Sequence, residues 1–432
     1  MLTIHNALIA LVGIFPALLF FDSSLAAGLI AFCSACVLGR YVFTMRPGEA
    51  NHLMTVIRWP AALAAVLLLW FIVQLIPMPT GGVSHSIWDS ASSALNAPLW
   101  AGVSIDPGMT IVAMTGYLAT IALVFVSAGL SIDRANAERV LLTCAIACVA
   151  ATLVLVITDI GGWIPASAPA TFGTHAALIA GAAYGAVYCA AVTIMVLERF
   201  ETRRGRGGLW SNPLTAIAVS TGGFAICCIA VLFAAANHAI LAMVGGIATI
   251  AIIYLVRRLG FGIVATTTLT LLCVFAAATI IYTKGNAAAG DISARYAAAG
   301  SPELIASVSR IIGEVGLGGS GGGTFDALYR LYGASAGGGR ILPPTFASQI
   351  AIEMGWPALW VFAAIMLAIV LLCVRGAFGR GRDSFYASAG AGIGVTTMLL
   401  AFGDPSAGNP AIMVLLATTF GLALAQSVSR KI

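Results

Sequence analysis

Long apolar segments separated by short polar ones dominate the sequence. Most of them are close to the ~20 residues that an α-helix needs to cross the hydrocarbon core of a bilayer. The first is expected to be retained as a helix, since it lacks a basic start and an A-x-A cleavage site. The pattern predicts twelve spans, at residues 5–21, 24–44, 60–77, 109–130, 140–158, 175–197, 213–235, 239–256, 261–282, 346–374, 385–402 and 410–427.

Composition supports this assignment and excludes several other classes. The chain of 432 residues is 60% hydrophobic and only 9% charged, whereas a soluble domain is about 25% charged. Disordered chains are polar, and membrane β-barrels alternate apolar with polar positions. We therefore predict an all-α polytopic membrane bundle of about 12 transmembrane helices, with residues 1–432 forming a single transmembrane domain.

The basic residues predict the orientation of this bundle. Of the 21 Lys and Arg residues, all but five fall in loops or tails that face one side. Because positive charge is enriched on the cytoplasmic side, both termini are expected to be cytoplasmic. Basic residues confined to short loops between spans do not predict nucleic-acid binding. The five exceptions lie in one long outer segment, residues 283–345, between spans nine and ten: Lys284, Arg295, Arg310, Arg330 and Arg340.

This outer segment is predicted to hold two short helices. Ser301-Pro302-Glu303 is a typical helix start, and an apolar stripe at helical spacing follows over residues 304–312. Thr324 is expected to cap a second helix that Gly333 ends. Because each helix has one apolar face, both are expected to lie against the membrane or over the mouth of the bundle.

A glycine-rich run from Gly316 to Phe325 joins the two helices. Its backbone N–H groups could cradle an anion, with Gly318 and Gly321 as candidate binding positions, or the run could be a flexible hinge. It is not an ATP-binding Walker A loop, because no Lys-Ser/Thr pair follows. The neighbouring arginines could pair with the local acids, or they could bind phosphate, which suits a guanidinium group.

The order of several motifs resembles the O-antigen ligase and Wzy-type polysaccharide polymerase superfamily of bacterial inner-membrane proteins. The resemblance covers roughly residues 65–375, and its outer motifs occur in the family's order. They are Pro77-Met78-Pro79, Ser104-Ile105-Asp106-Pro107-Gly108-Met109-Thr110, Thr171-Phe172-Gly173-Thr174-His175-Ala176, Arg295, Gly316-Leu317-Gly318 through Phe325, and Gln349-Ile350-Ala351-Ile352-Glu353-Met354-Gly355.

The resemblance implies a function and a location. Such proteins transfer a glycan from undecaprenyl pyrophosphate to an acceptor hydroxyl on the periplasmic face of the inner membrane, without metal, nucleotide or other cofactor. The implied partners are the lipid-linked glycan, membrane lipids, and polysaccharide export or assembly proteins. Two family residues are missing: a His-Asn pair aligns with Pro344-Thr345, and an S-R-G arginine aligns near Ala236-Asn237-His238. These losses favour a polymerase branch over a ligase, or a member that has lost catalysis.

Candidate catalytic residues follow from the resemblance and from charge. Arg295 has the family's arginine position, and Arg310 lies on the polar side of the first outer helix, so both are candidates to bind pyrophosphate. His175 and His238, at the outer ends of their spans, could each replace the missing family histidine. Glu353 is an acid beside a membrane span, where it is either catalytic or paired with an arginine.

Candidate substrate-binding residues share the same outer region. Thr345, Gln349 and Glu353 recur every four residues, so they are predicted to form one polar stripe on a helix that Trp356-Pro357 kinks. Arg340 lies just before this stripe. The substrate-binding candidates are therefore Gln349, Thr345, Gly318, Gly321 and Arg340.

Two further interpretations stay open. The chain could be a non-catalytic subunit of a polysaccharide assembly machine, consistent with the missing family residues. It could also be a twelve-span carrier, although its largest loop is on the outside and its halves show no repeat. The nine cysteines, including Cys33 and Cys36 in a C-x-x-C pattern, are expected to be apolar packing residues rather than a metal or redox site.

Overall fold

The computed structural model describes most, but not all, of the chain. The predicted span at 261–282, apart from position 268, lies outside the described residues, and so do the candidates Arg295 and Arg340. The described residues are 2–20, 23–45, 47–79, 84–161, 169–201, 213–259, 268, 302–332, 341–379 and 383–427.

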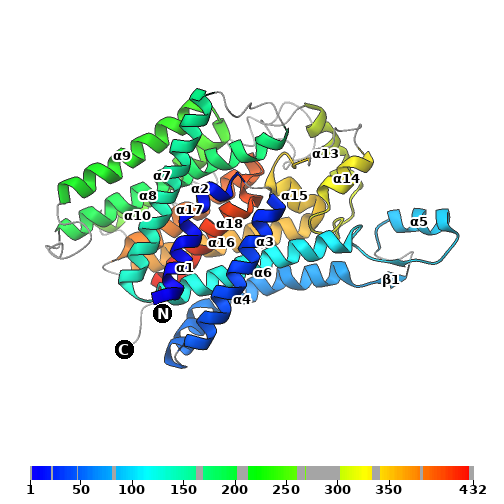
Figure 1. The fold of residues 1–432 in the computed structure, drawn as a ribbon, viewed down its shortest axis with the longest axis horizontal. Coiled ribbons are helices and arrows are strands. Elements are labelled where there is room, and N and C mark those ends of the chain that lie inside the picture. Colours follow the sequence, from blue (N-terminus) through cyan, green and yellow to red (C-terminus); the bar gives the residue numbers. More distant parts are fainter. Residues whose placement is uncertain are drawn as a thin grey trace.

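The described chain is almost entirely helical, with one small two-stranded ribbon (Figure 1). In chain order the elements are α1 Leu2–Gly13, α2 Phe15–Leu18, α3 Ser23–Thr44, α4 Pro47–Leu75, β1 Met78–Pro79, α5 Ile87–Leu95, β2 Trp100–Ala101, α6 Pro107–Leu130, α7 Arg134–Gly161, α8 Pro169–Glu201, α9 Pro213–Phe233, α10 Asn237–Leu259, α13 Pro302–Glu314, α14 Phe325–Tyr332, α15 Phe346–Glu353, α16 Trp356–Gly379, α17 Ser384–Gly403, the 3₁₀ turn η1 Ser406–Gly408, and α18 Pro410–Ser427.

Ten of the described helices are long and apolar enough to cross a membrane, which confirms the all-α membrane class. They coincide with ten of the twelve predicted spans. The first predicted span, 5–21, is not one long helix: α1 ends at Gly13, and the short α2 follows. Pro16 explains the break, because proline has no N–H to donate to the carbonyl of the preceding turn.

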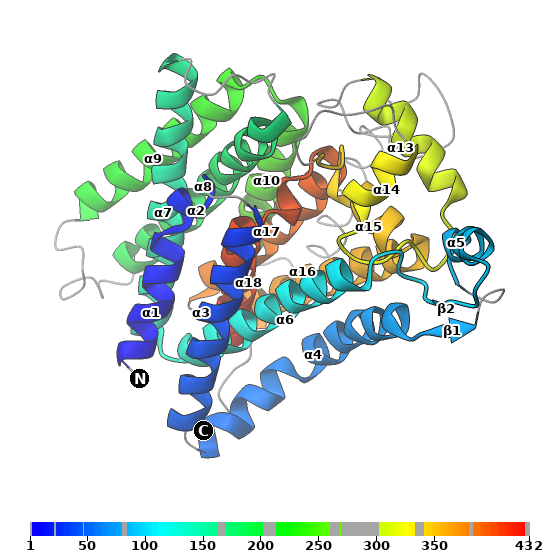
Figure 2. The ribbon, with the colours of Figure 1, turned by 45° about the vertical axis from the view of Figure 1, so that its right-hand side comes forward.

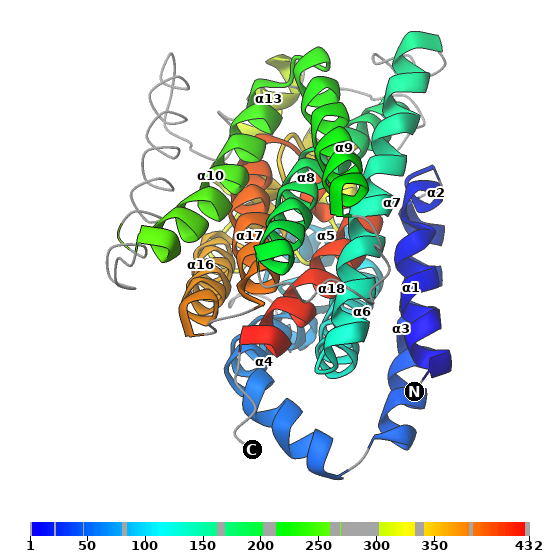
Figure 3. The same ribbon diagram turned by 90° about the vertical axis from the view of Figure 1, so that its left-hand side faces the viewer.

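Three helices form the centre of the bundle. In α8, α17 and α18, 83%, 89% and 83% of the most apolar window is buried inside the protein, and Figure 3 shows them surrounded by the other helices. Small residues permit this close packing. A Cβ on Gly246 of α10 would lie 3.0 Å from the Gly392 carbonyl oxygen of α17, and one on Gly390 would lie 2.3 Å from Ala423 of α18.

The bundle has two distinct ends. The start of α1 and the end of α18 lie at one end, which we call the N/C end, and α13 and α14 lie at the other, which we call the loop end (Figures 2 and 3). The helices of the predicted outer segment are thus on the opposite side of the bundle from the termini. This is the arrangement that the positions of the basic residues predicted.

A hairpin joins α4 to α6. Its arms are β1 and β2, paired antiparallel in the register Met78↔Ala101 and Pro79↔Trp100, and between them α5 projects beyond the bundle (Figures 1 and 2). The His85 ring holds the start of α5, because its Nδ1 accepts the N–H of Ile87 at 3.3 Å. Burial lowers the pKa of His85 below its ordinary value of 6.5.

We expect the hydrogen bond between His85 and Ile87 at the start of α5 to be lost at acidic pH. A protonated Nδ1 cannot accept a hydrogen bond, and a base whose pKa is lowered by folding binds its proton more readily in the unfolded chain. The stabilisation by His85 is therefore complete above pH 6.5 and is lost as the pH falls through the lower pKa of the folded protein. NMR of [¹³C-ε1]-histidine protein, assigned with His85→Gln, measures this pKa. A midpoint at or above 6.5 would contradict the assignment.

Candidate functional site

The short helix α15 is fixed at its start by its own side chains. Thr345 is its N-cap: the Thr345 hydroxyl accepts the N–H of Ser348 at 3.0 Å, and the Ser348 hydroxyl accepts the N–H of Thr345 at 3.2 Å. Such a reciprocal capping box satisfies N–H groups that a helix start otherwise leaves without partners. Thr345, a candidate for substrate binding, is fully buried and serves as a helix cap.

Glu353, the last residue of α15, connects that helix to α14. Its side chain is 7% exposed, and its Oε1 accepts the backbone N–H of Phe325 at 3.3 Å and the Nε2–H of Gln349 at 3.2 Å. Phe325 is the first residue of α14, where the helix dipole favours a negative charge. Two of the three residues in the predicted polar stripe, Gln349 and Glu353, therefore interact directly.

The helix is interrupted between α15 and α16. The sequence predicted one span over 346–374 with a kink at Trp356-Pro357, but α15 ends at Glu353 and a separate helix begins at Trp356. Gly355 causes the break, because it has φ +85° and its Cα faces the Leu317 carbonyl so closely that a Cβ would lie 2.0 Å from that oxygen. Only glycine adopts this conformation without strain.

Gln74, near the end of α4, binds the glycine-rich run to the end of α15. Its Nε2 donates to the carbonyl oxygens of Gly318 at 3.0 Å and Glu353 at 2.9 Å, and its Oε1 accepts the N–H of Gly322 at 3.3 Å. The side chain is fully buried. Trp70, one turn earlier, adds a bond from its Nε1 to the Met354 carbonyl at 2.8 Å.

The Ser104 motif completes this arrangement from the start of α6. The hydroxyls of Ser104 and Thr110 lie 2.7 Å apart, and Asp106 caps α6 by accepting the N–H of Met109 at 3.0 Å. Ile105, the residue after Ser104, donates its N–H to the carbonyl of Ser320 in the glycine-rich run at 2.9 Å. We call the resulting group the glycine-loop cluster: Gln74, Ser104, residues 318–325 and Glu353.

Within this cluster the glycine-rich run is a packed support. Six of its N–H groups donate to protein acceptors at 2.9–3.4 Å, namely those of Gly319, Ser320, Gly321, Gly322, Thr324 and Phe325. Because these donors are engaged and the middle of the run is buried, the arrangement favours a fixed scaffold over both the predicted anion cradle and the predicted hinge.

A second polar contact at this end of the bundle pairs His238 with Asp404. At the start of α10, its Nε2 is 3.1 Å from Oδ2 of Asp404, the residue that ends α17. Asp404 is 1% exposed at its side chain; its Oδ1 accepts the N–H of Ser406 at 2.8 Å and also the Ser406 hydroxyl. Its carbonyl accepts the N–H of Phe346 at 2.9 Å, which joins the pair to the start of α15.

Asp404 is an acid at the end of an apolar span, a position at which acids are often functional, and this is its only signal in the sequence. Its pairing with His238 could not be predicted, since 166 residues separate the two. Gln349 packs against the turn η1, which follows Asp404: its Oε1 is 3.1 Å from the position that a Cβ on Gly408 would occupy. Its amide also bonds to Glu353 of the glycine-loop cluster, so it lies between the two groups.

The other candidates lie at the edge of this region. His175 contacts Asp159 at 3.2 Å, and nearby Gly173 packs against Leu342, in the segment that leads into α15. Arg310 is exposed on α13. The opposite, apolar face of α13 packs with α14 and α15 in a small core around Val308, Phe325 and Ile352. The predicted outer helices therefore cover α15.

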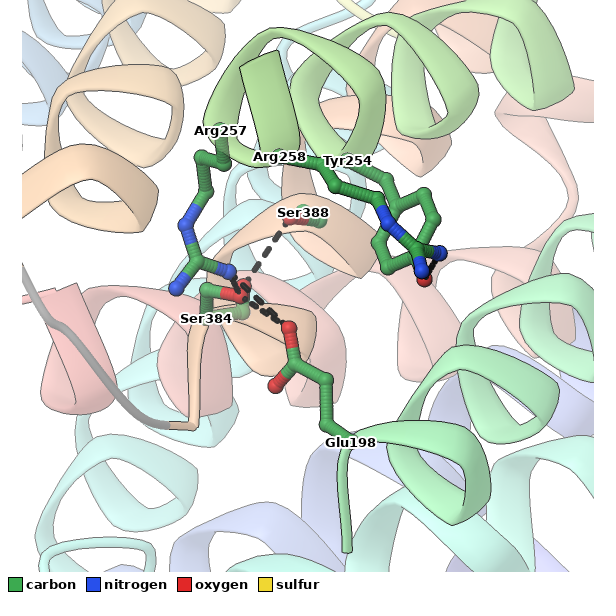
Figure 4. Close-up of polar contacts among 6 residues, drawn as sticks. All are labelled: Glu198, Tyr254, Arg257, Arg258, Ser384 and Ser388. Atoms are coloured by element: carbon green, nitrogen blue, oxygen red, sulfur yellow. Dashed lines mark hydrogen bonds and ion pairs between the residues drawn. The ribbon is translucent and has the colours of Figure 1, made fainter. Parts of the chain in front are cut away.

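At the N/C end an ion-pair network joins the ends of several described helices. Arg257 of α10 donates to Glu198 of α8 at 3.0 Å and to the Ser384 hydroxyl, which itself donates to Glu198 at 3.2 Å (Figure 4). Arg199 pairs with Glu138 at 2.6 Å, and Arg134 pairs with Asp383 at 2.9 Å. These contacts fasten the ends of α7, α8, α10 and α17 to one another.

Four of the described cysteines are packing residues at one helix contact. Cys144, Cys148, Cys189 and Cys227 are buried between α7, α8 and α9, and Gly185 and Gly223 pack against their side chains. Within the described residues there is no group of three or more His, Cys, Asp or Glu side chains that could hold a metal ion.

Comparison with known proteins assigns no family to this site. No protein-family model matches the chain, and no curated protein matches it either.

Replacing Gln74 is expected to destabilise the protein strongly. Gln74→Ala leaves the Gly318 carbonyl and the Gly322 N–H without their partner, whereas the Glu353 carbonyl keeps the N–H of Gly321. Each unsatisfied buried group costs about 1–3 kcal/mol, so a loss of about 2–6 kcal/mol in the free energy of unfolding is expected. Gln349→Ala is the matched control, because its half-buried amide makes a single hydrogen bond to Glu353. Unfolding in mixed SDS micelles measures both. Equal losses would contradict the special role of Gln74.

Substitution of Gly355 is expected to disrupt the break between α15 and α16. Gly355→Ala forces a Cβ against the Leu317 carbonyl at a strained positive φ, so we expect a loss above about 3 kcal/mol or failure to fold. The control is Gly313→Ala in α13, where a Cβ meets nothing within 4 Å; it should be neutral or gain up to about 1 kcal/mol, because alanine favours helix. Thermal unfolding in detergent compares the two. Similar stability of both variants would refute the explanation.

Proposed function

We propose that this protein transfers a glycan from an undecaprenyl pyrophosphate carrier to an acceptor hydroxyl at the loop end of the bundle. A polysaccharide polymerase is favoured over a ligase, since the family's histidine is missing. The observation that carries the proposal is convergence. Candidates chosen separately along the sequence, among them Gly318, Gln349, Glu353 and His238, lie in one connected polar region at this end.

The acceptor hydroxyl is activated by His238. Asp404 accepts from Nε2 of the ring, so the proton resides on Nε2 and Nδ1 is the basic nitrogen. The acceptor oxygen attacks the anomeric carbon as its proton passes to His238. The bond between that carbon and the pyrophosphate oxygen breaks, and the electron pair leaves with the pyrophosphate.

The leaving pyrophosphate requires positive charge. Arg310 on α13 supplies it, together with Arg295 and Arg340 of the predicted outer segment, and guanidinium groups suit the phosphate oxygens. Gln349 contacts the glycan and is held by Glu353, which thus acts as a positioning residue. The glycine-loop cluster provides the rigid base that keeps these groups in place.

This function requires the loop end to face the periplasm. The protein then lies in the bacterial inner membrane with both termini cytoplasmic, and the ion pairs around Arg257 and Arg199 lie on the cytoplasmic side. The confinement of basic residues supports this orientation. Polysaccharide export or assembly proteins are the expected partners.

A non-catalytic assembly subunit is the second candidate. One observation favours it: the glycine-rich run, which could have bound phosphate, uses its N–H groups for internal contacts. In that case the loop end is a rigid docking platform, and glycan synthesis in the absence of the chain would continue while the complex fails to assemble.

The proposal is tested by the lipid-linked glycan profile of cells that lack the protein. Accumulated single repeat units indicate a polymerase, and full-length glycan left on the carrier indicates a ligase. Wild type should restore long glycan. His238→Gln should lower it at least about 100-fold, the usual contribution of an acid–base group, and Arg295→Ala should lower it by about 100-fold as well, because it removes positive charge that stabilises the leaving pyrophosphate.

Two controls accompany this experiment. Arg330→Ala removes an exposed arginine that pairs with Asp326 on the same helix, and it should restore the profile fully. Immunoblots of membranes check that every variant is present in equal amount. An unchanged profile in the deletion strain would reject both enzyme activities, and solute uptake by the protein would then favour a carrier.

A further inference from the structure

Helix α5 has two chemically distinct halves. At helical spacing, Ile87, Trp88, Ala91 and Leu95 fall on one side, and Asp89 and the three serines of the helix fall on the other. None of its residues is buried. Within the described structure Ile87, Trp88 and Ala91 are only partly covered by protein, and Leu95 is 66% exposed.

The apolar surface extends into the returning strand. Trp100 in β2 is 79% exposed, which is unusual for so large a side chain in a protein whose core is well packed. The segment 84–106 carries no Lys or Arg, so attraction to anionic headgroups does not explain its position. Tryptophan does favour the boundary between lipid chains and headgroups, because its ring is apolar and its N–H is polar.

The place of the hairpin fits that boundary. It joins the ends of α4 and α6, two helices able to cross a membrane, of which α4 has only 17% of its apolar window buried in the protein. Large apolar residues on these helices are exposed as well, among them Leu69 and Ile72 on α4 and Val112 on α6. The apolar half of α5 is thus continuous with a surface that faces lipid chains.

The hairpin is fastened to the root of α6, so the start of α5 stays close to that helix. His85, just before α5, donates its N–H to the Gly102 carbonyl at 3.1 Å. The Trp88 Nε1 also donates to the Ser104 carbonyl at 3.2 Å, which ties the first turn of α5 to the root of α6.

We propose that α5 is a membrane-interface anchor, with Leu95 and Trp100 inserted among the lipids of the leaflet at the loop end and the serine side facing water. The anchor is connected to the candidate site. Ser104, which accepts from Trp88, donates its own N–H to the Gln74 carbonyl at 3.2 Å. The lipid contact therefore fixes the height of the glycine-loop cluster relative to the bilayer. This assignment does not depend on the reaction that the protein performs.

Site-directed spin labelling in lipid nanodiscs tests the anchor. The background protein carries alanine at Cys33, Cys36, Cys228 and Cys273, and the five remaining cysteines are buried. One new cysteine is then introduced by Leu95→Cys or Trp100→Cys on the apolar side, or by Ser93→Cys as the matched control on the opposite side of the same helix. Each nitroxide is measured for collisions with oxygen, which concentrates in lipid, and with a water-soluble nickel chelate.

The expected result is a several-fold higher ratio of oxygen to nickel collisions at positions 95 and 100 than at position 93. Equal access to the nickel chelate at all three positions would overturn the proposal, because α5 would then lie in water. Shielding of position 95 from both reagents, with disulfide-linked dimers of Leu95→Cys, would also overturn it and identify a second copy of the chain as the occupant.

Discussion

The buried amide of Gln74 is the interaction on which the loop end depends. Its three hydrogen bonds join α4 to the glycine-rich run and to the end of α15, both of which lie more than 240 residues further along the chain. Because the side chain is fully buried, each of its polar atoms depends on these protein partners, so the geometry is tightly specified. The contact lies beside Gly355 and beside Glu353, which accepts the first N–H of α14.

The two ends of the bundle solve different physical problems. At the N/C end, ion pairs such as Arg257–Glu198 and Arg199–Glu138 hold helix ends together, and they suit a boundary where charged side chains can reach water. At the loop end, the elements are held together by uncharged polar groups and by two carboxylates, Glu353 and Asp404, which are buried inside the protein. Each of these acids is surrounded by donors, which is how a buried charge is tolerated.

The central helices make this arrangement possible. α8, α17 and α18 have little surface outside the protein, and their glycines and alanines let backbones approach closely. The elements that are not simple spans, α5 and the pair α13 and α14, are attached at the periphery of this closely packed centre. Asp404 ends a central helix, so the His238 that it holds is positioned by the most rigid part of the molecule.

The class of the protein, the positions of ten spans and the amphipathic helices of the outer segment could be predicted from the pattern of apolar residues alone. Hydrophobic length and helical spacing are local properties, and the membrane imposes them on each segment separately. The sequence also indicated Glu353, Gln349 and His238 as candidates, because polar groups beside apolar spans are conspicuous. The three-dimensional fold was needed to show that Gln74 and Asp404 are their partners, that Thr345 is a cap, that the glycine-rich run is a packed support and that Gly355 separates two helices. These contacts join residues far apart in the chain, and no local pattern encodes which distant groups will meet.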